Sequence, residues 1–299
     1  MIQLGQDLAD AGRSLAPELE GVYTGLIEKI GLPQPGAPPR PPHALSLPVL
    51  ELPYWVGLKL ERDQGRDQGA SRRLAMLAAA HGYMLVRLQD DRLDEGLGEE
   101  SSSLMLGNVL MIDHVASLYA AAGPPAPEWA AQIRRAWCDF GDGMLVERQH
   151  DPVGSWTLPA WERSMGRFAP LILPAVAMLH HAGVPGHAPT LAELLHPLVR
   201  AHQLVEDAFD LFDDLAAGRR TWFATRLGPD PDAVWLGGGL AEAIDEAERL
   251  LAPAAQAWSK AGYPDGAAHI ARRIYTTRAR LAGVEDTLAR LWRQPKPRR

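Results

Sequence analysis

Apolar residues recur at intervals of three and four along almost the whole chain, and this periodicity limits the fold more than any other feature. In the first such stretch the spacing places one side of a helix on the core. Its members are Leu4, Leu8, Ala11, Leu15, Leu19, Val22 and Leu26. No stretch of useful length alternates apolar and polar residues as a half-buried strand does, and no hairpin signal is present. The sequence therefore predicts an all-α protein, most simply a single bundle of about ten helices.

Proline and glycine separate the predicted helices. A Pro-rich loop is expected over residues 33–48 and a basic tail over 294–299. Ser71 is expected to cap the helix that Gly96 and Gly98 stop, and Gly218 is expected to end a later one. The expected helices after the first stretch cover about 53–62, 71–95, 103–122, 128–149, 159–182, 190–217, 240–261 and 266–293. We expect one helical domain over residues 1–299.

Composition excludes several classes of protein. With 299 residues, 46% of them hydrophobic, the chain can bury a large core. Its net charge of −7 argues against non-specific nucleic-acid binding. The single cysteine, Cys138, cannot form an intrachain disulfide and fits a reducing, cytoplasmic location. We expect neither a signal peptide nor a membrane span, because the N-terminus lacks a basic start and no apolar run approaches 18 residues.

Two acid-rich segments, residues 89–95 and 203–214, continue or end strongly apolar helices. In the first, Asp94 lies three and four residues after Asp91 and Asp90. In the second, a single helical stripe is expected to carry Gln203, Asp207, Asp210 and Asp214, with Glu206 beside it. Like charges at this spacing repel by roughly 0.2–0.5 kcal/mol per exposed pair, and crowding them beside apolar residues costs more. The two segments therefore suggest a shared cation, and oxygen-only ligands indicate Mg²⁺.

Basic residues accompany these acids. Arg167 precedes the second segment, and further arginines follow it or lie on the last predicted helix. These are Arg219, Arg220, Arg226, Arg272, Arg273 and Arg278. The planar fork of arginine suits the oxygens of a phosphate group.

With these motifs the chain resembles the isoprenoid synthase superfamily of trans-prenyltransferases and class I terpene cyclases. Asp90-Asp91-Arg92-Leu93-Asp94 matches its DDxxD motif, and residues 203–210 resemble Q-x-x-D-D-x-x-D with Glu206 in place of the first Asp. Arg167 stands where a diphosphate-binding Lys is usual, and Arg219 where the Lys of a Gly-Lys pair is usual. Gln149 and Asp151 are similar to a G-Q-x-x-D element one helix earlier. The match spans about residues 75–226, in the right order.

The resemblance implies a fold, a cofactor and roles for named residues. It implies a central apolar cavity, Mg²⁺, a small-molecule prenyl diphosphate substrate and a homodimer. The implied metal ligands are Asp90, Asp91, Asp94, Gln203, Glu206, Asp207 and Asp210. The implied catalytic residues are Arg167, Arg219 and Arg220, and the implied substrate-binding residues are Arg167, Phe168, Phe209, Arg272 and Arg273.

Two departures from the superfamily pattern decide between activities. Chain-elongating enzymes carry Arg-Arg-Gly soon after the first motif and Gly-Lys-x-x-Arg near the N-terminus, and both serve the second diphosphate. Residues 96–103 contain no basic residue, and the N-terminal element has no convincing counterpart. The pattern therefore favours a class I terpene synthase that ionises one prenyl diphosphate and cyclises or quenches the carbocation. A trans-prenyltransferase, of the polyprenyl diphosphate synthase or the squalene/phytoene synthase type, remains the alternative. A non-catalytic helical partner subunit is a second one.

Overall fold

The computed structural model describes residues 2–32, 47–95, 101–124, 126–228, 230 and 235–293. Its elements in this part of the chain are α-helices, short 3-10 helices and one π-helical turn, with no strand among the described residues. The all-α prediction is confirmed. Gly96, Gly98, residues 33–46 of the Pro-rich loop and the tail over 294–299 lie outside the described residues.

The described chain forms two compact units. Of the described residues, those within 2–32, 48–140 and 168–192 belong to unit 1, and residue 47 with those within 141–167 and 193–293 belong to unit 2. Each unit is described by itself below. One domain over residues 1–299 and a central apolar cavity therefore stay predictions.

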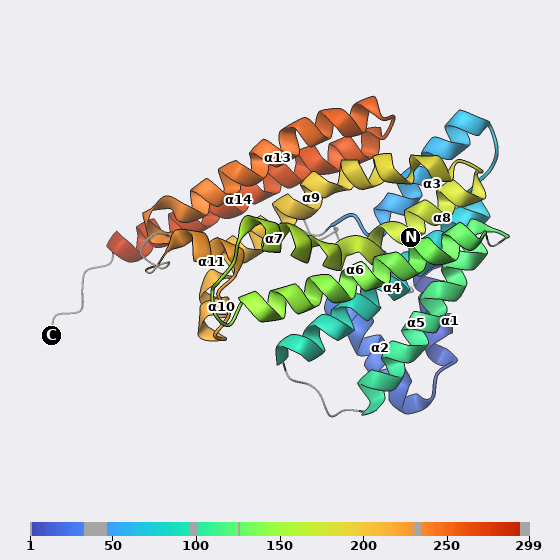
Figure 1. The fold of residues 1–299 in the computed structure, drawn as a ribbon, viewed down its shortest axis with the longest axis horizontal. Coiled ribbons are helices and arrows are strands. Elements are labelled where there is room, and N and C mark those ends of the chain that lie inside the picture. Colours follow the sequence, from blue (N-terminus) through green and yellow to red (C-terminus); the bar gives the residue numbers. More distant parts are fainter. Residues whose placement is uncertain are drawn as a thin grey trace. The chain divides into compact units, whose positions relative to one another are not determined.

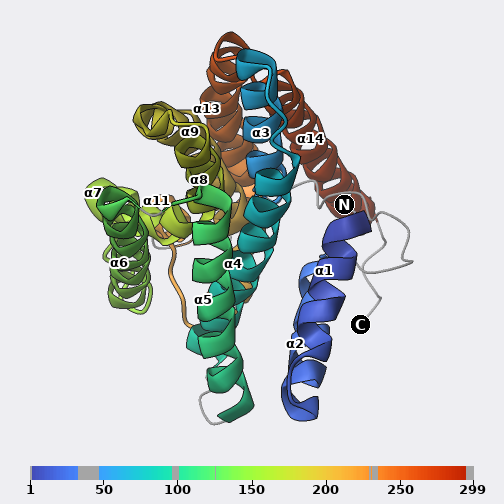
Figure 2. The same cartoon turned by 90° about the vertical axis from the view of Figure 1, so that its right-hand side faces the viewer.

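Unit 1 is built on the long helices α4 (Gly69–Glu95) and α5 (Ser101–Ala122), which lie side by side (Figure 2). Helices α1 (Ile2–Arg13) and α2 (Pro17–Ile30) pack against this pair, as do α3 (Glu51–Gln64) and α8 (Leu173–His181). The short η2 (Pro185–His187) follows α8. The unit also holds the first residues of α6 (Pro127–His150) and of α9 (Ala188–Phe209).

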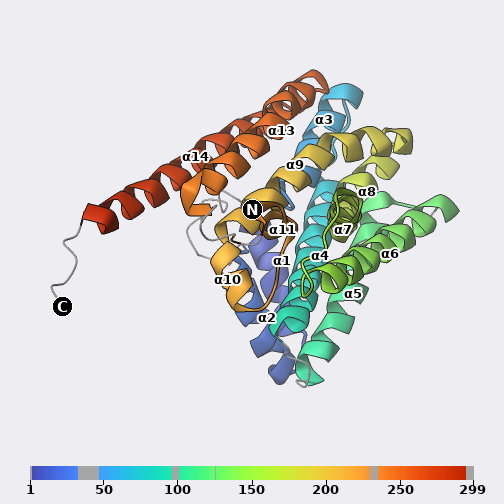
Figure 3. The same ribbon diagram turned by 60° about the vertical axis from the view of Figure 1, so that its left-hand side comes forward.

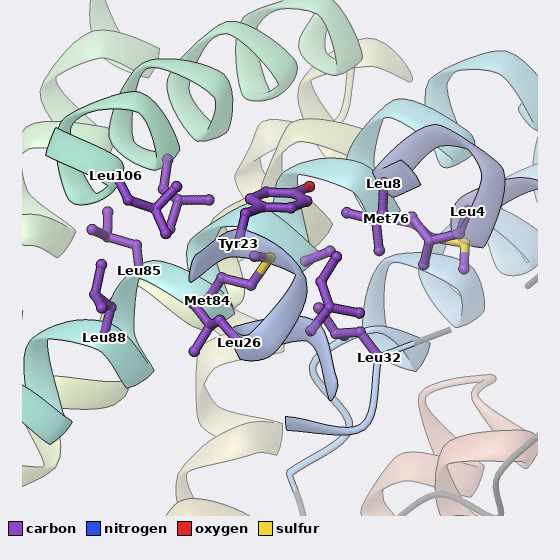
Figure 4. Close-up of a cluster of buried hydrophobic side chains, with 13 residues drawn as sticks. Leu4, Leu8, Tyr23, Leu26, Leu32, Met76, Met84, Leu85, Leu88 and Leu106 are labelled. Atoms are coloured by element: carbon purple, nitrogen blue, oxygen red, sulfur yellow. The ribbon is translucent and has the colours of Figure 1, made fainter. Parts of the chain in front are cut away.

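The core of unit 1 is made by the apolar faces that the periodicity predicts. Figure 4 shows the side chains from α1, α2, α4 and α5 that meet there. They include Leu4, Leu8, Tyr23, Leu26, Met76, Met84, Leu85, Leu88 and Leu106, each at most 7% exposed. Burial of these side chains is the main favourable term for the unit, at roughly 1.5–3 kcal/mol for each large apolar side chain.

Two local features of unit 1 differ from the sequence predictions. The stripe from Leu4 to Leu26 is divided between two helices, because Ala16 is extended (φ −62°, ψ 147°) and Pro17 begins α2. Ser71 is not an N-cap, since α4 already begins at Gly69. Its buried hydroxyl instead donates a 2.6 Å hydrogen bond to the carbonyl of Ala121, which ties α4 to the end of α5.

Unit 2 contains the antiparallel hairpin of α13 (Leu240–Lys260) and α14 (Pro264–Arg293), whose two helices lie side by side in Figures 1 and 3. The unit also contains α7 (Leu158–Ser164), α10 (Leu211–Ala216), α11 (Trp222–Leu227) and the π-helical η3 (Trp235–Gly239). Trp258 anchors the hairpin. Its indole packs so closely on Gly266 that a Cβ there would lie 2.3 Å from the ring, and it donates a 2.8 Å hydrogen bond to the carbonyl of Leu194.

Two predicted helices of the second half are divided in the structure. The helix expected over 159–182 is instead α7, the 3-10 segment η1 (Met165–Ile172) and α8, because Pro170 and Pro174 interrupt the helical hydrogen bonds. The helix expected over 190–217 is divided into α9 and α10 at Asp210, whose φ and ψ are −96° and 7°. Helix α11 was not predicted, although Thr221 caps it. The stop at Gly218 is confirmed, with φ 76°.

Among the described residues, α5 is long and apolar enough to cross a membrane by length and composition alone. A core helix of a protein with no membrane span passes the same test. The finding therefore does not by itself place the chain in a membrane.

Candidate active site

The first acidic motif lies in the last turns of α4, in unit 1, and its first two carboxylates, those of Asp90 and Asp91, form ion pairs with basic side chains. Arg87 binds Asp90 at 2.6 Å and Asp91 at 3.3 Å from one turn earlier. Lys29, on α2, binds the other oxygen of Asp91 at 2.7 Å. Both oxygens of Asp91 thus contact a cation. Asp94 lies in the same helix, and its side chain falls outside the described part.

The second acidic motif, in unit 2, is linked to Arg167 through Gln203. One guanidinium nitrogen of Arg167 binds the carboxylate of Glu147, and another binds the side-chain oxygen of Gln203. The amide nitrogen of Gln203 in turn donates to Asp207. These four residues come from α6, η1 and α9, and they form one continuous polar chain through a part-buried region.

Gly143 explains how η1 can bring Arg167 to α6. A Cβ on Gly143 would lie 2.5 Å from the backbone nitrogen of Arg167 and 2.8 Å from the carbonyl of Ser164. Real side chains do not approach backbone atoms so closely, so only glycine lets the two segments touch here. Any larger residue would push Arg167 away from Glu147.

Burial raises the pKa values of two carboxyls in this network, and neighbouring negative charges add to the rise. Asp207 is 4% exposed among Leu204, Val205 and Ala208, and its burial raises the pKa of its carboxyl well above the usual value. Burial likewise raises the pKa of Asp151, 7% exposed, to about 7, and the negative charge of Glu147 adds to that rise. Arg167 lowers both pKa values without cancelling the effect. A bound cation would favour the charged form of both carboxyls, so metal binding here would lower their pKa values.

A second ion pair stands beside this network. Asp214, on α10, accepts from Arg219 at 2.7 Å and 3.1 Å, and its charge raises the pKa of both Asp151 and Asp207. Asp210 lies at the surface, where partial desolvation raises the pKa of its carboxyl and the positive charges of Arg280 and Arg219 lower it. The predicted residues Gln203, Asp207, Arg167 and Arg219 are thus joined through one set of acids.

Glu206, on α9, and Arg273, on α14, belong to a separate group of polar side chains. Arg273 is 1% exposed, and burial lowers the pKa of its guanidinium to about 10. It lies 2.9 Å from the ring nitrogen Nδ1 of His202, which is 3.9 Å from the carboxylate of Glu206. The charge of Glu206 supports the charged form of Arg273. Arg272, by contrast, is exposed on α14.

The remaining predicted residues have separate surroundings. The guanidinium of Arg220 binds the carbonyl of Gly228, and its backbone N–H donates 2.8 Å to the carbonyl of Asp151. Phe209, the last residue of α9, lies under the guanidinium of Arg280, 3.7 Å from the ring centre. Phe168 is half-buried in η1, next to Arg167 in the chain. Arg220 therefore holds a turn in place, whereas the ring of Phe209 is covered by a cation.

A comparison with solved structures finds a similarity to heptaprenyl diphosphate synthase from Staphylococcus aureus, with a TM-score of 0.68 at 17% sequence identity. The match covers 92% of this chain and 95% of that enzyme. The chain has the isoprenoid synthase fold. No protein-family model and no curated protein matches the sequence.

The donors at both acidic motifs of this isoprenoid synthase fold suit Mg²⁺ in kind, because all are oxygen atoms. In the described part of the chain, no three carboxylate, histidine or cysteine side chains lie together in an arrangement that could hold a metal ion by themselves. Mg²⁺ keeps several waters and is often held by one or two carboxylates plus substrate phosphates. The buried oxygen donors of Gln203 and Asp207, with the buried Asp151 in the same network, are therefore the observation that fits such an ion.

Sequence reasoning missed the partners that hold the motif residues of the isoprenoid synthase fold. They are Lys29, Arg87, Glu147 and Arg280. Arg87 and Glu147 left a local signal, since each lies three or four residues before a noted acid. Lys29 and Arg280 left none, because helices distant in sequence bring them to Asp91 and Phe209.

Proposed function

We propose that this protein is an isoprenoid-synthase-type enzyme that acts on a prenyl diphosphate. The observation that carries the proposal is the network of Glu147, Arg167, Gln203 and Asp207 in unit 2. It places the guanidinium group of Arg167 beside the carboxylates of Glu147 and Asp207. Binding of a metal-coordinated diphosphate requires both kinds of group, a cation for the phosphate oxygens and oxygen ligands for the metal. The fold that it shares with a heptaprenyl diphosphate synthase supports the same substrate class.

Each part of the network has a proposed role. Arg167 and Arg219 donate hydrogen bonds to the diphosphate, while Glu147 and Asp214 hold their guanidinium groups in place. Asp207 and Gln203, with Asp210 and Glu206, offer oxygen atoms to Mg²⁺, as do Asp90, Asp91 and Asp94 of the first motif. Bound Mg²⁺ would neutralise the negative charge that grows on the diphosphate leaving group.

Of the two reactions open to such a site, we propose transfer of a prenyl group. The support is the solved neighbour, which is a prenyl diphosphate synthase. A class I terpene synthase is the second candidate, and its support is the lack of basic residues over 96–103, where a second diphosphate is usually bound. A non-catalytic partner subunit is the third.

One assay separates these candidates. Labelled allylic diphosphates of ten to twenty-five carbons are incubated with and without isopentenyl diphosphate, and with and without Mg²⁺, and the products are identified by mass spectrometry. A longer linear product that requires isopentenyl diphosphate supports transfer. A cyclic or hydroxylated product without it supports the terpene synthase. No Mg²⁺-dependent diphosphate release from any substrate leaves the partner subunit.

Removal of one motif acid is expected to abolish product formation while the fold remains. In Asp91→Ala and in Asp210→Ala we expect product to fall by at least about 100-fold, because each loses a charged oxygen ligand. Circular dichroism checks the fold. Lys29→Met is the matched control for Asp91→Ala, since it breaks the same ion pair but keeps the carboxylate. Full turnover in Asp91→Ala would contradict the proposed role of Asp91 as a metal ligand. A loss in Lys29→Met equal to that in Asp91→Ala would contradict it as well.

A homodimer and a cytoplasmic location are also proposals. The superfamily resemblance supports the first, and the single exposed thiol of Cys138 supports the second. Light scattering of the purified protein measures the mass in solution, and a monomer at micromolar concentration would contradict the dimer.

A further inference from the structure

The guanidinium of Arg280 covers one face of Phe209. Its central carbon lies 3.7 Å from the ring centre, well inside the range of about 6 Å for a cation–π contact. Phe209 ends α9 and Arg280 lies on α14, so the contact joins the end of the second acidic motif to the C-terminal helix. The next residue after Phe209 is Asp210, whose carboxylate is close enough to Arg280 for the two opposite charges to attract each other.

Two other arginines of α14 are engaged elsewhere. Arg273 is buried against His202, and Arg278 forms ion pairs with Asp245 and Glu248 on α13. Arg280 is exposed, as is Arg272, but Arg280 is the one that stacks beside Asp210. Arg219 also acts on Asp210 from the turn after α10. Two arginines from separate segments therefore direct positive charge at the end of α9.

We propose that Arg280 is a further diphosphate-binding residue, and that it leaves the face of Phe209 when the anion binds. This inference rests on the proposed function. An exposed cation–π contact is weak, whereas a guanidinium fork makes two charge-assisted hydrogen bonds to phosphate oxygens. The exchange of one contact for the other is therefore favourable. Departure of Arg280 exposes an aromatic face, which a prenyl chain or an allylic cation can then contact.

If Arg280 binds the anion, loss of Arg280 and loss of Phe209 should change the affinity in opposite directions. A merely structural role of the contact would not produce opposite changes. Loss of the arginine removes a ligand of the anion and weakens binding. Loss of the ring removes only the contact that holds Arg280 in the free protein, so binding of the anion should become tighter. These opposite signs follow from the free state holding Arg280 on Phe209.

Calorimetric titration of the full-length protein with inorganic diphosphate in the presence of Mg²⁺ tests the proposal. In Arg280→Met we expect roughly ten-fold weaker binding, as for the loss of one charge-assisted contact. In Phe209→Leu we expect binding about two- to five-fold tighter, the fold-change that corresponds to an exposed cation–π contact. Arg249→Met, which removes an exposed arginine of α13, is the matched control and should bind as the wild type does.

Each outcome decides one question. If the wild type binds diphosphate and Arg280→Met binds equally well, the role of Arg280 is overturned and the proposed function stands. If Phe209→Leu binds more weakly, Arg280 is not held back by the ring and the exchange is overturned. If the wild type itself does not bind diphosphate with Mg²⁺, the proposed function falls and this inference falls with it. Circular dichroism of each variant confirms that it is folded.

Discussion

Replacement of Arg167 by methionine is expected to lower kcat/KM for the prenyl diphosphate by roughly 10³-fold. The guanidinium of Arg167 contacts both Glu147 and Gln203, and its charge lowers the pKa of Asp151 and of Asp207. The variant loses a donor aimed at developing negative charge, a loss of about 10²–10³ in other sites. It also leaves the neighbouring carboxylates without their central cation. Steady-state kinetics with the substrate identified by the product screen measure the effect.

Arg163→Met is the matched control for Arg167→Met. Arg163 is also an arginine of unit 2 that forms an ion pair with an acid of α6, since it binds Asp142 at 2.6 Å and 2.7 Å. That pair is exposed to solvent, so we expect kcat/KM within about two-fold of wild type. Equal losses in both variants, or near-complete activity in Arg167→Met, would remove Arg167 from the proposed site.

The helical class could be predicted because it depends on a local signal. A spacing of three and four is imposed on every apolar stretch that packs one face on a core, as Leu4 to Leu26 do. Breaks within a helix are harder to predict, because a proline ends the helix at some positions and is accommodated inside it at others. Pro170 and Pro174 divided a predicted helix, whereas Pro197 and Pro253 lie inside α9 and α13. The difference depends on tertiary packing, which a single sequence does not reveal.

The acids of the site could be proposed from the sequence, but their partners could not. Glu147 and Arg167 meet because Gly143 lets η1 approach α6, and no spacing rule relates those three positions. The same limit applies to the basic residues of α14. They looked alike in sequence, as positive charges on a terminal helix, yet Arg273 is buried against His202 and Arg280 lies on Phe209.

Acid is expected to destabilise unit 1 through two buried histidines. His81 and His114 are 2% and 0% exposed, and burial lowers the pKa of each to about 4. An unfolded histidine has a pKa near 6.5, so the folded state resists protonation. Stability is complete above pH 6.5 and is lost as the pH falls from 6.5 towards 4. Between pH 7.5 and 4.5 each histidine should cost roughly 2–3 kcal/mol. Asp113 opposes this loss of stability in acid, because burial raises the pKa of its carboxyl.

Unit 2 is expected to respond in the opposite direction. The folded-state pKa of Asp151 is raised to about 7, against 3.8 for an ordinary aspartate. The folded unit therefore gains stability as the pH falls through 7. Between pH 8 and pH 5 the gain from Asp151 is roughly 2–3 kcal/mol. Asp207 adds to it, because its pKa is raised for the same reason.

Hydrogen exchange read by mass spectrometry measures both units in one sample, once intrinsic exchange rates are corrected for pH. Between pH 7.5 and 5 we expect the protection of α4 and α5 to fall and that of the end of α6 and of α9 to rise. In His114→Asn the fall in α4 and α5 should be smaller, because the amide can still donate to the carbonyl of Ala78, which now lies 2.8 Å from the ring nitrogen, and cannot titrate. His187→Gln, at an exposed histidine of η2, is the control and should follow the wild type. A parallel fall in both units would contradict the opposite directions in which burial shifts these pKa values, lowered for the two histidines and raised for the two aspartates.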